Sequence, residues 1–132
     1  MKYFLMLFAV FTFFSPISKW CTIYSQEYYV AYIYDTDSSN GLSFRSFLSA
    51  ANYTTSLIKI SDISTTNLDD FDLIIIDSRS GYAGYWGTPQ EVQIIQNTNK
   101  PIFALGTGGS SFYQQLGLSI QWLYGWTASD TM

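Results

Sequence analysis

The chain has 132 residues, of which 48% are hydrophobic and 12% are charged, so it holds enough apolar side chains for the core of one small domain. It has no histidine and one cysteine, Cys21, which excludes from this sequence a Ser-His-Asp triad, a Cys-His pair, an imidazole metal site and an internal disulfide. The formal net charge is −4 and the basic residues are scattered, so we expect no nucleic-acid partner.

The N-terminal segment has the pattern of a signal peptide. Lys2 supplies a positive charge, and residues 3–14 form an apolar run that is too short to span a bilayer. We expect a signal peptide at residues 1–25 and a domain at residues 26–132, secreted or located in the periplasm or cell envelope. Earlier cleavage is one alternative, and an uncleaved segment that anchors the chain in a membrane is another.

The rest of the chain alternates between strand patterns and helix patterns. Aromatic and β-branched runs predict buried strands, polar turn segments separate them, and Thr88 followed by Pro89 predicts the start of a helix. In chain order the predicted elements are strands at 28–34, 54–60 and 73–76, helices at 42–52 and from 88 onward, a strand, glycine turn and helix start over 100–117, and a further strand at 118–122.

Strands that alternate with helices at short spacing are typical of a parallel sheet with helices on both faces. Right-handed crossovers then bring the carboxyl end of every strand to one edge of the sheet. We therefore expect a three-layer α/β fold whose site lies at that edge. No closing helix pattern follows residues 118–122, so we also expect the sheet to be incomplete on its C-terminal side and the sequence to be a piece of a longer protein.

Residues with binding chemistry follow three of the predicted strands. A turn rich in acids follows the first strand, an acid-arginine segment follows the third, and glycines and serines at 106–111 follow the fourth. Glycines let a ligand approach the backbone, and a helix N-terminus favours an anion. The alternative is a tight strand-to-helix turn in which Ser110 or Ser111 only caps the helix. The expected ligand-binding residues are Asp35, Asp77, Arg79, Gly106, Thr107, Gly108 and Ser110.

These segments do not match the established motifs for nucleotides, hydrolysis or calcium. The glycine segment lacks the Lys-Ser/Thr pair of a Walker A loop, has Ser111 in place of the third glycine of G-x-G-x-x-G, and does not contain G-x-S-x-G. In the acidic turn, Asn40 stands at the glycine position of an EF-hand loop and Ser46 at its last, acidic position. We expect no cofactor and no metal.

The order of elements and the segment Pro-Ile-Phe-Ala-Leu-Gly-Thr-Gly-Gly-Ser at 101–110 resemble the class I glutamine amidotransferase-like superfamily. This flavodoxin-like fold includes the DJ-1/PfpI and ThuA-like branches, and the resemblance covers roughly residues 28–122. Catalytic members carry Gly-x-Cys-x-Gly, with the nucleophilic cysteine on a strained elbow. Here Ala104, Gly106 and Gly108 stand at those positions, and the partner histidine is absent. The resemblance implies a flavodoxin-like member that has lost its nucleophile.

Aromatic residues gather on the loop that follows the third predicted strand. Tyr82, Tyr85 and Trp86 alternate there with glycines at the expected site edge. In an exported protein, exposed aromatic side chains stack on sugar rings or on another protein. The alternative is that they fold over the sheet as a lid and contact no ligand.

Three functions are compatible with these patterns. We favour a non-catalytic ligand-binding or interaction module, because the sequence places no base beside a hydroxyl. The alternative is a hydrolase in which Thr107 or Ser110 works with Asp35 and Asp77. The third is an interaction domain of a larger surface protein that uses the aromatic loop or an open sheet edge. The expected partners are a small molecule or carbohydrate, a second copy, or the rest of a larger parent chain.

Overall fold

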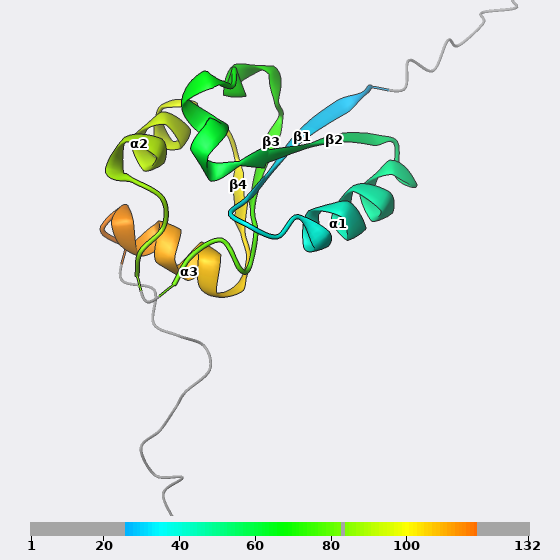
Figure 1. Ribbon diagram of the computed structural model, residues 1–132. Coiled ribbons are helices and arrows are strands. Elements are labelled where there is room, and N and C mark those ends of the chain that lie inside the picture. The colour runs from blue at the N-terminus through cyan, green and yellow to red at the C-terminus, as the bar shows by residue number, and fades with distance from the viewer. Residues whose placement is uncertain (1–25, 83, 119–132) are drawn as a thin grey trace, which may run out of the picture.

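The computed structural model describes residues 26–82 and 84–118. In this part of the chain four parallel strands form one sheet with the order β2-β1-β3-β4, and helices cover both faces (Figure 1). The predicted three-layer α/β fold is confirmed, and the strand order is that of a flavodoxin-like sheet. The strands are β1 (Tyr28–Tyr34), β2 (Tyr53–Lys59), β3 (Leu73–Ile76) and β4 (Ile102–Ala104).

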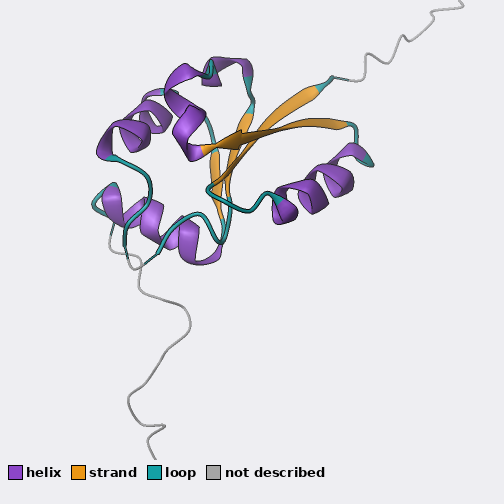
Figure 2. Ribbon diagram, viewed as in Figure 1, coloured by secondary structure: helices purple, strands orange, loops and turns teal. Residues whose placement is uncertain are grey.

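One helix lies on one face of the sheet and two lie on the other (Figure 2). Helix α1 (Ser39–Ser49) packs over β1 and β2, whereas α2 (Pro89–Asn97) and α3 (Gly106–Gln115) pack on the opposite face. Two short 3₁₀ helices, η1 (Ile60–Thr65) and η2 (Leu68–Asp70), connect β2 to β3. The predicted signal peptide and the predicted strand at 118–122 lie outside the described residues, except for Leu118.

Strand β1 is buried on both faces, as its continuous apolar sequence predicts. Val30 and Tyr32 face α1, while Ala31 and Ile33 face α2 and α3. Neighbouring strands lie on both sides of β1 and pair with it in parallel register. This central position explains why no polar residue interrupts Val30–Ile33.

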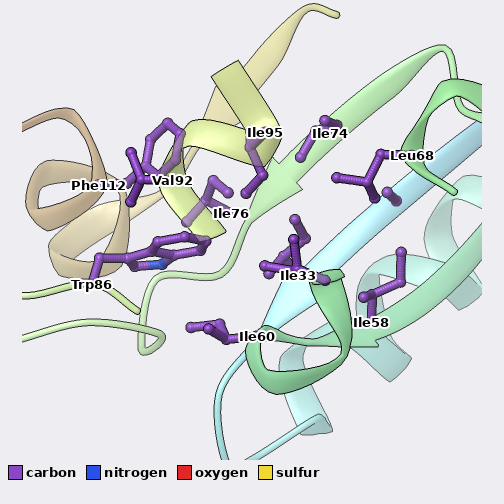
Figure 3. Packing of buried hydrophobic residues seen from close by; sticks show 12 residues of the cluster. Ile33, Ile58, Ile60, Leu68, Ile74, Ile76, Trp86, Val92, Ile95 and Phe112 are labelled. Atoms are coloured by element: carbon purple, nitrogen blue, oxygen red, sulfur yellow. The ribbon is translucent and has the colours of Figure 1, made fainter. Parts of the chain in front are cut away.

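The larger part of the core lies between the sheet and helices α2 and α3 (Figure 3). Trp86 and Phe112 meet edge to face there, with ring centroids 4.9 Å apart and an interplanar angle of 80°. The buried apolar residues of this cluster are Ala31, Ile33, Ile58, Ile60, Ile63, Leu68, Ile74, Ile76, Trp86, Val92, Ile95 and Phe112.

Strand β4 lies at one end of the described sheet, opposite β2, and is short and only partly covered. Phe103 lies on the α1 face of the sheet, beside Ile75, and 54% of its surface is exposed, because α1 covers β1 and β2 rather than β4. On the outer side of β4, the Tyr113 hydroxyl donates a 3.2 Å hydrogen bond to the carbonyl oxygen of Ile102. In the described part of the chain, no helix is both long and apolar enough to cross a bilayer.

The beginnings of two helices differ from the prediction. Helix α1 begins at Ser39 instead of Leu42, where the Ser39 amide donates a 2.8 Å hydrogen bond to the Asp37 carboxylate. Helix α3 begins at Gly106, so that the predicted glycine turn forms the first turn of the helix itself. The alternative in which Ser110 or Ser111 caps this helix is wrong, because Leu105 occupies the N-cap position.

Candidate functional site

The carboxyl ends of β1 and β3 lie side by side and form the edge where a site was expected. From β1 the chain passes through α1 to β2, at one end of the sheet. From β3 it passes through α2 to β4, at the opposite end. Such a reversal opens a crevice outside the strand ends, where ligands bind in open α/β sheets. A cavity of about 370 Å³ lies there, lined among others by Asp35, Arg79, Ser80, Gly81, Tyr82 and Tyr85.

Arg79 lies in the wall of this cavity and is held in position by two neighbours. Its guanidinium forms a 2.9 Å ion pair with the Asp37 carboxylate and donates a 2.8 Å hydrogen bond to the Ser39 hydroxyl. Hydrogen bonding from Ser39 lowers the pKa of Asp37, and the nearby charge of Arg79 lowers it further. Asp35 is exposed and lines the same cavity, so two of the three predicted charged residues, Asp35 and Arg79, come together.

Asp77 directly follows β3, is 1% exposed and is not among the residues that line the cavity. Its carboxylate accepts a 2.7 Å hydrogen bond from the Tyr32 hydroxyl and a 3.0 Å bond from the Asn40 amide. Burial raises the pKa of Tyr32, and its hydrogen bond to Asp77 and the charge of that carboxylate raise it further. Asp77 therefore joins β3 to β1 and α1, and its side chain does not line the cavity as predicted.

A buried serine connects the end of β3 to the aromatic loop. The Ser80 hydroxyl donates a 2.7 Å hydrogen bond to the Asp77 carbonyl oxygen and accepts a 2.8 Å bond from the Trp86 indole. Trp86 is 1% exposed and belongs to the core, so for this residue the structure matches the alternative in which the aromatic side chain folds over the sheet, and not the exposed platform. Neither Ser80 nor Asn40 was among the predicted site residues, although Asn40 stands in the acidic turn that follows β1.

Tyr82 and Tyr85 are exposed, at 80% and 79% of their surface. Each amide donates to the other residue's carbonyl oxygen, at 3.0 and 2.9 Å, in an isolated antiparallel bridge. Residues directly opposite in such a pair project their side chains from the same face. We call these two residues the tyrosine pair.

The main chain beside the tyrosine pair is tied to helix α3. The Gln115 side chain donates a 2.6 Å hydrogen bond to the Trp86 carbonyl oxygen, and the Gly84 amide donates a 3.3 Å bond to the Ser111 hydroxyl. The ring of Trp86 packs edge to face against Phe112 of α3. The tyrosine side chains are thus exposed next to main chain that is hydrogen-bonded to α3.

The glycines of α3 make room for protein backbone. Gly106 has a φ of +49°, and a Cβ there would lie 2.9 Å from that of Ser78. A Cβ on Gly108 would overlap the Asp77 carbonyl oxygen, and the Gly108 amide already donates a 2.8 Å hydrogen bond to the Ser78 carbonyl oxygen. The space beside Gly106 and Gly108, where a ligand was predicted to approach, is occupied by the loop after β3.

Two further predicted residues, Thr107 and Ser110, lie on α3 and do not line the cavity. The Ser110 hydroxyl is buried and has no hydrogen-bond partner among the described residues. Of the seven predicted binding residues, the structure thus brings Asp35 and Arg79 to the cavity wall. A second cavity, of about 280 Å³, lies between η2 and the C-terminal end of α2 and includes none of them.

Comparison with protein-family models, with curated proteins and with solved structures finds no match to this chain. The resemblance of residues 101–110 to the class I glutamine amidotransferase-like superfamily therefore stays a prediction from the sequence.

Proposed function

We propose that this chain is an exported, non-catalytic ligand-binding module of the amidotransferase-like type, and that its ligand occupies the cavity between the ends of β1 and β3. The observation that carries the proposal is the pairing of a cavity with oppositely charged side chains, Asp35 and Arg79, at the reversal point of the sheet. Asp37 and Ser39 hold the guanidinium before any ligand arrives. A group that is already positioned loses little conformational entropy on binding.

The burial of Asp77 supports binding over catalysis. An acid or base must reach the proton that it transfers. The Asp77 carboxylate is instead enclosed and hydrogen-bonded to Tyr32 and Asn40. The alternative hydrolase has less support, because Asp77, Thr107 and Ser110 do not line the cavity, whereas its remaining member, Asp35, does.

The backbone at Gly106 supports the amidotransferase-like part of the proposal. The resemblance places the missing nucleophile at this position, on a strained elbow. Gly106 has a φ of +49°, in the left-handed region that residues other than glycine rarely adopt. This backbone conformation is compatible with such an elbow, at a residue that has no side chain to attack a substrate.

Titration of the ¹⁵N-labelled full chain tests the proposal. The probes are neutral disaccharides, inorganic phosphate, choline, and mixtures of amino acids and carboxylic acids, followed by amide chemical shifts. We expect at least one class to shift the signals of Asp35, Arg79 and Gly81 together, with smaller changes around Asn67 and Asn97 in the second cavity.

Two matched variants give the control. Asp35→Asn should change the affinity for the class that binds, whereas Asp70→Asn, which removes an exposed carboxylate on η2, should leave it unchanged. Shifts confined to the second cavity, or no shift with any class, would overturn the proposed site. Chemical conversion of a bound probe by the purified chain would overturn its non-catalytic character.

A further inference from the structure

The tyrosine pair borders the cavity and gives it an aromatic rim. Tyr82 and Tyr85 both line the cavity, and both are among the most exposed large side chains of the described residues. The neighbouring main chain at Gly84 and Trp86 is hydrogen-bonded to α3, and the two rings are exposed beside it. An aromatic ring with a free face offers an apolar platform, and the phenol adds a polar tip.

The cavity wall offers both signs of charge. Asp35 supplies acceptors, and Arg79 supplies donors, because a guanidinium has more N–H groups than its bonds to Asp37 and Ser39 use. An anionic ligand would meet the carboxylate of Asp35, and a cationic ligand would meet the guanidinium of Arg79. A neutral ligand rich in hydroxyl groups can donate to the first and accept from the second.

The size and shape of the cavity favour a small ligand over a protein surface. Its volume of about 370 Å³ lies at the lower end of the range of about 300–1,000 Å³ that small-molecule sites have. Flat protein interfaces are instead built around apolar anchors in a patch from which charged residues are depleted. Here the rings of Tyr82 and Tyr85 instead lie beside a cavity whose wall contains the charged side chains of Asp35 and Arg79, which is more typical of a small-molecule site.

We propose that the cavity binds a neutral carbohydrate, whose sugar ring stacks on the tyrosine pair while its hydroxyl groups hydrogen-bond to Asp35 and Arg79. This inference rests on the proposed function, since it names the class of ligand for the same cavity. The alternating apolar and polar faces of a sugar ring match the combination of a platform and a charged wall. No covalent step is involved.

The test uses the full chain on an array of neutral, sialylated and sulfated glycans, followed by calorimetric titration of the best soluble glycan. We expect binding to neutral glycans, and about a tenfold loss of affinity in Tyr82→Ala and in Tyr85→Ala. Tyr82→Phe keeps the ring and should stay within about twofold of the unchanged chain. Phe47→Ala is the matched control, because Phe47 is 74% exposed on α1 and does not line the cavity.

Asp35→Asn separates the classes of ligand. It should weaken binding of a neutral glycan, because an acceptor is lost, whereas an anionic glycan should bind more tightly once the repulsion is removed. Binding only to anionic glycans, to phosphate or to choline at this cavity would overturn the carbohydrate inference and leave the proposed function standing. Neutral-glycan binding that survives both tyrosine-to-alanine changes would overturn it too. If no class of probe perturbs the cavity, both proposals are wrong.

Discussion

The hydroxyl of Tyr32 donates a 2.7 Å hydrogen bond to the buried carboxylate of Asp77, which joins β1 to the end of β3. Asn40 completes this small network from the first turn of α1. The Asp77 carboxylate thus connects three elements, β1, α1 and the end of β3. A buried carboxylate that loses one of its donors keeps the full cost of burial, so this network should matter more for stability than for binding.

The first prediction concerns alkaline pH. The pKa of Tyr32 is raised in the folded protein, so the unfolded chain loses this proton first, above about pH 10. Stability contributed by the protonated tyrosine is complete below that pH and is lost as the pH rises toward the folded pKa. Urea unfolding should therefore show a decline that begins near pH 10 and approaches about 1.4 kcal/mol per pH unit about one pH unit higher.

Tyr32→Phe is the variant that isolates this effect. It should lower the free energy of unfolding at neutral pH by about 1–3 kcal/mol, because Asp77 loses a donor, and it should reduce the alkaline decline. Tyr29 also has a raised pKa, chiefly through its hydrogen bond to Glu27, so part of the decline remains in the variant. An unchanged alkaline slope in Tyr32→Phe would contradict the assignment.

The second prediction concerns the first turn of α3. Gly108→Ala should lower the free energy of unfolding by about 2 kcal/mol or more, because the added methyl group overlaps the Asp77 carbonyl oxygen, which is part of the backbone. Gly117→Ala is the control: it has a φ of +77° but no atom near the added Cβ, and should cost about 1 kcal/mol. Equal losses in chemical denaturation would mean that crowding at Gly108 is relieved by movement of the loop.

The third prediction concerns the buried serine. Ser80→Ala removes the acceptor of the Trp86 indole and should lower the free energy of unfolding by about 1–3 kcal/mol. Ser64→Ala, at an exposed position of η1, should change it by less than about 0.5 kcal/mol. Thermal and urea unfolding of both variants measure the difference, and a Ser80→Ala chain as stable as the original would show that water replaces the hydroxyl.

The fourth prediction concerns the start of α2. Thr88 accepts a 3.4 Å hydrogen bond from the Glu91 amide, and the Glu91 carboxylate accepts a 2.6 Å bond from the Thr88 amide. Thr88→Ala should therefore cost about 1 kcal/mol of unfolding free energy, and Thr88→Ser should recover most of it. If the serine variant is as unstable as the alanine variant, the methyl group rather than the hydroxyl is responsible.

The elements with strong local signals were predictable from the sequence. The predicted strands at 28–34 and 73–76 match β1 and β3, and β2 is displaced by one residue. The capping box at Thr88 is also present, because all of its atoms come from four neighbouring residues. The start of α1 was missed, since the preceding turn offers several polar side chains: Ser38 takes the N-cap position without a side-chain bond, while Asp37, one residue earlier, accepts from the Ser39 amide.

The site was less predictable, because its assignments depend on distant partners. Asp77 and Asp35 both follow strands, and the sequence treats them alike. Their roles separate because Tyr32, 45 positions before Asp77, turns toward it and covers it. Likewise, Trp86 is buried by Ser80 and Phe112, whereas Tyr82 and Tyr85 have no such cover among the described residues.

The bond from Tyr113 to the Ile102 carbonyl oxygen has a consequence for the behaviour of concentrated protein. Alternate peptide groups of an outer strand point away from its neighbour and form a template on which another chain can extend the sheet. The Tyr113 phenol occupies one of these acceptors. Tyr113→Phe exposes it, so fibril or aggregate growth, followed by light scattering and a cross-β dye, should begin at lower protein concentration.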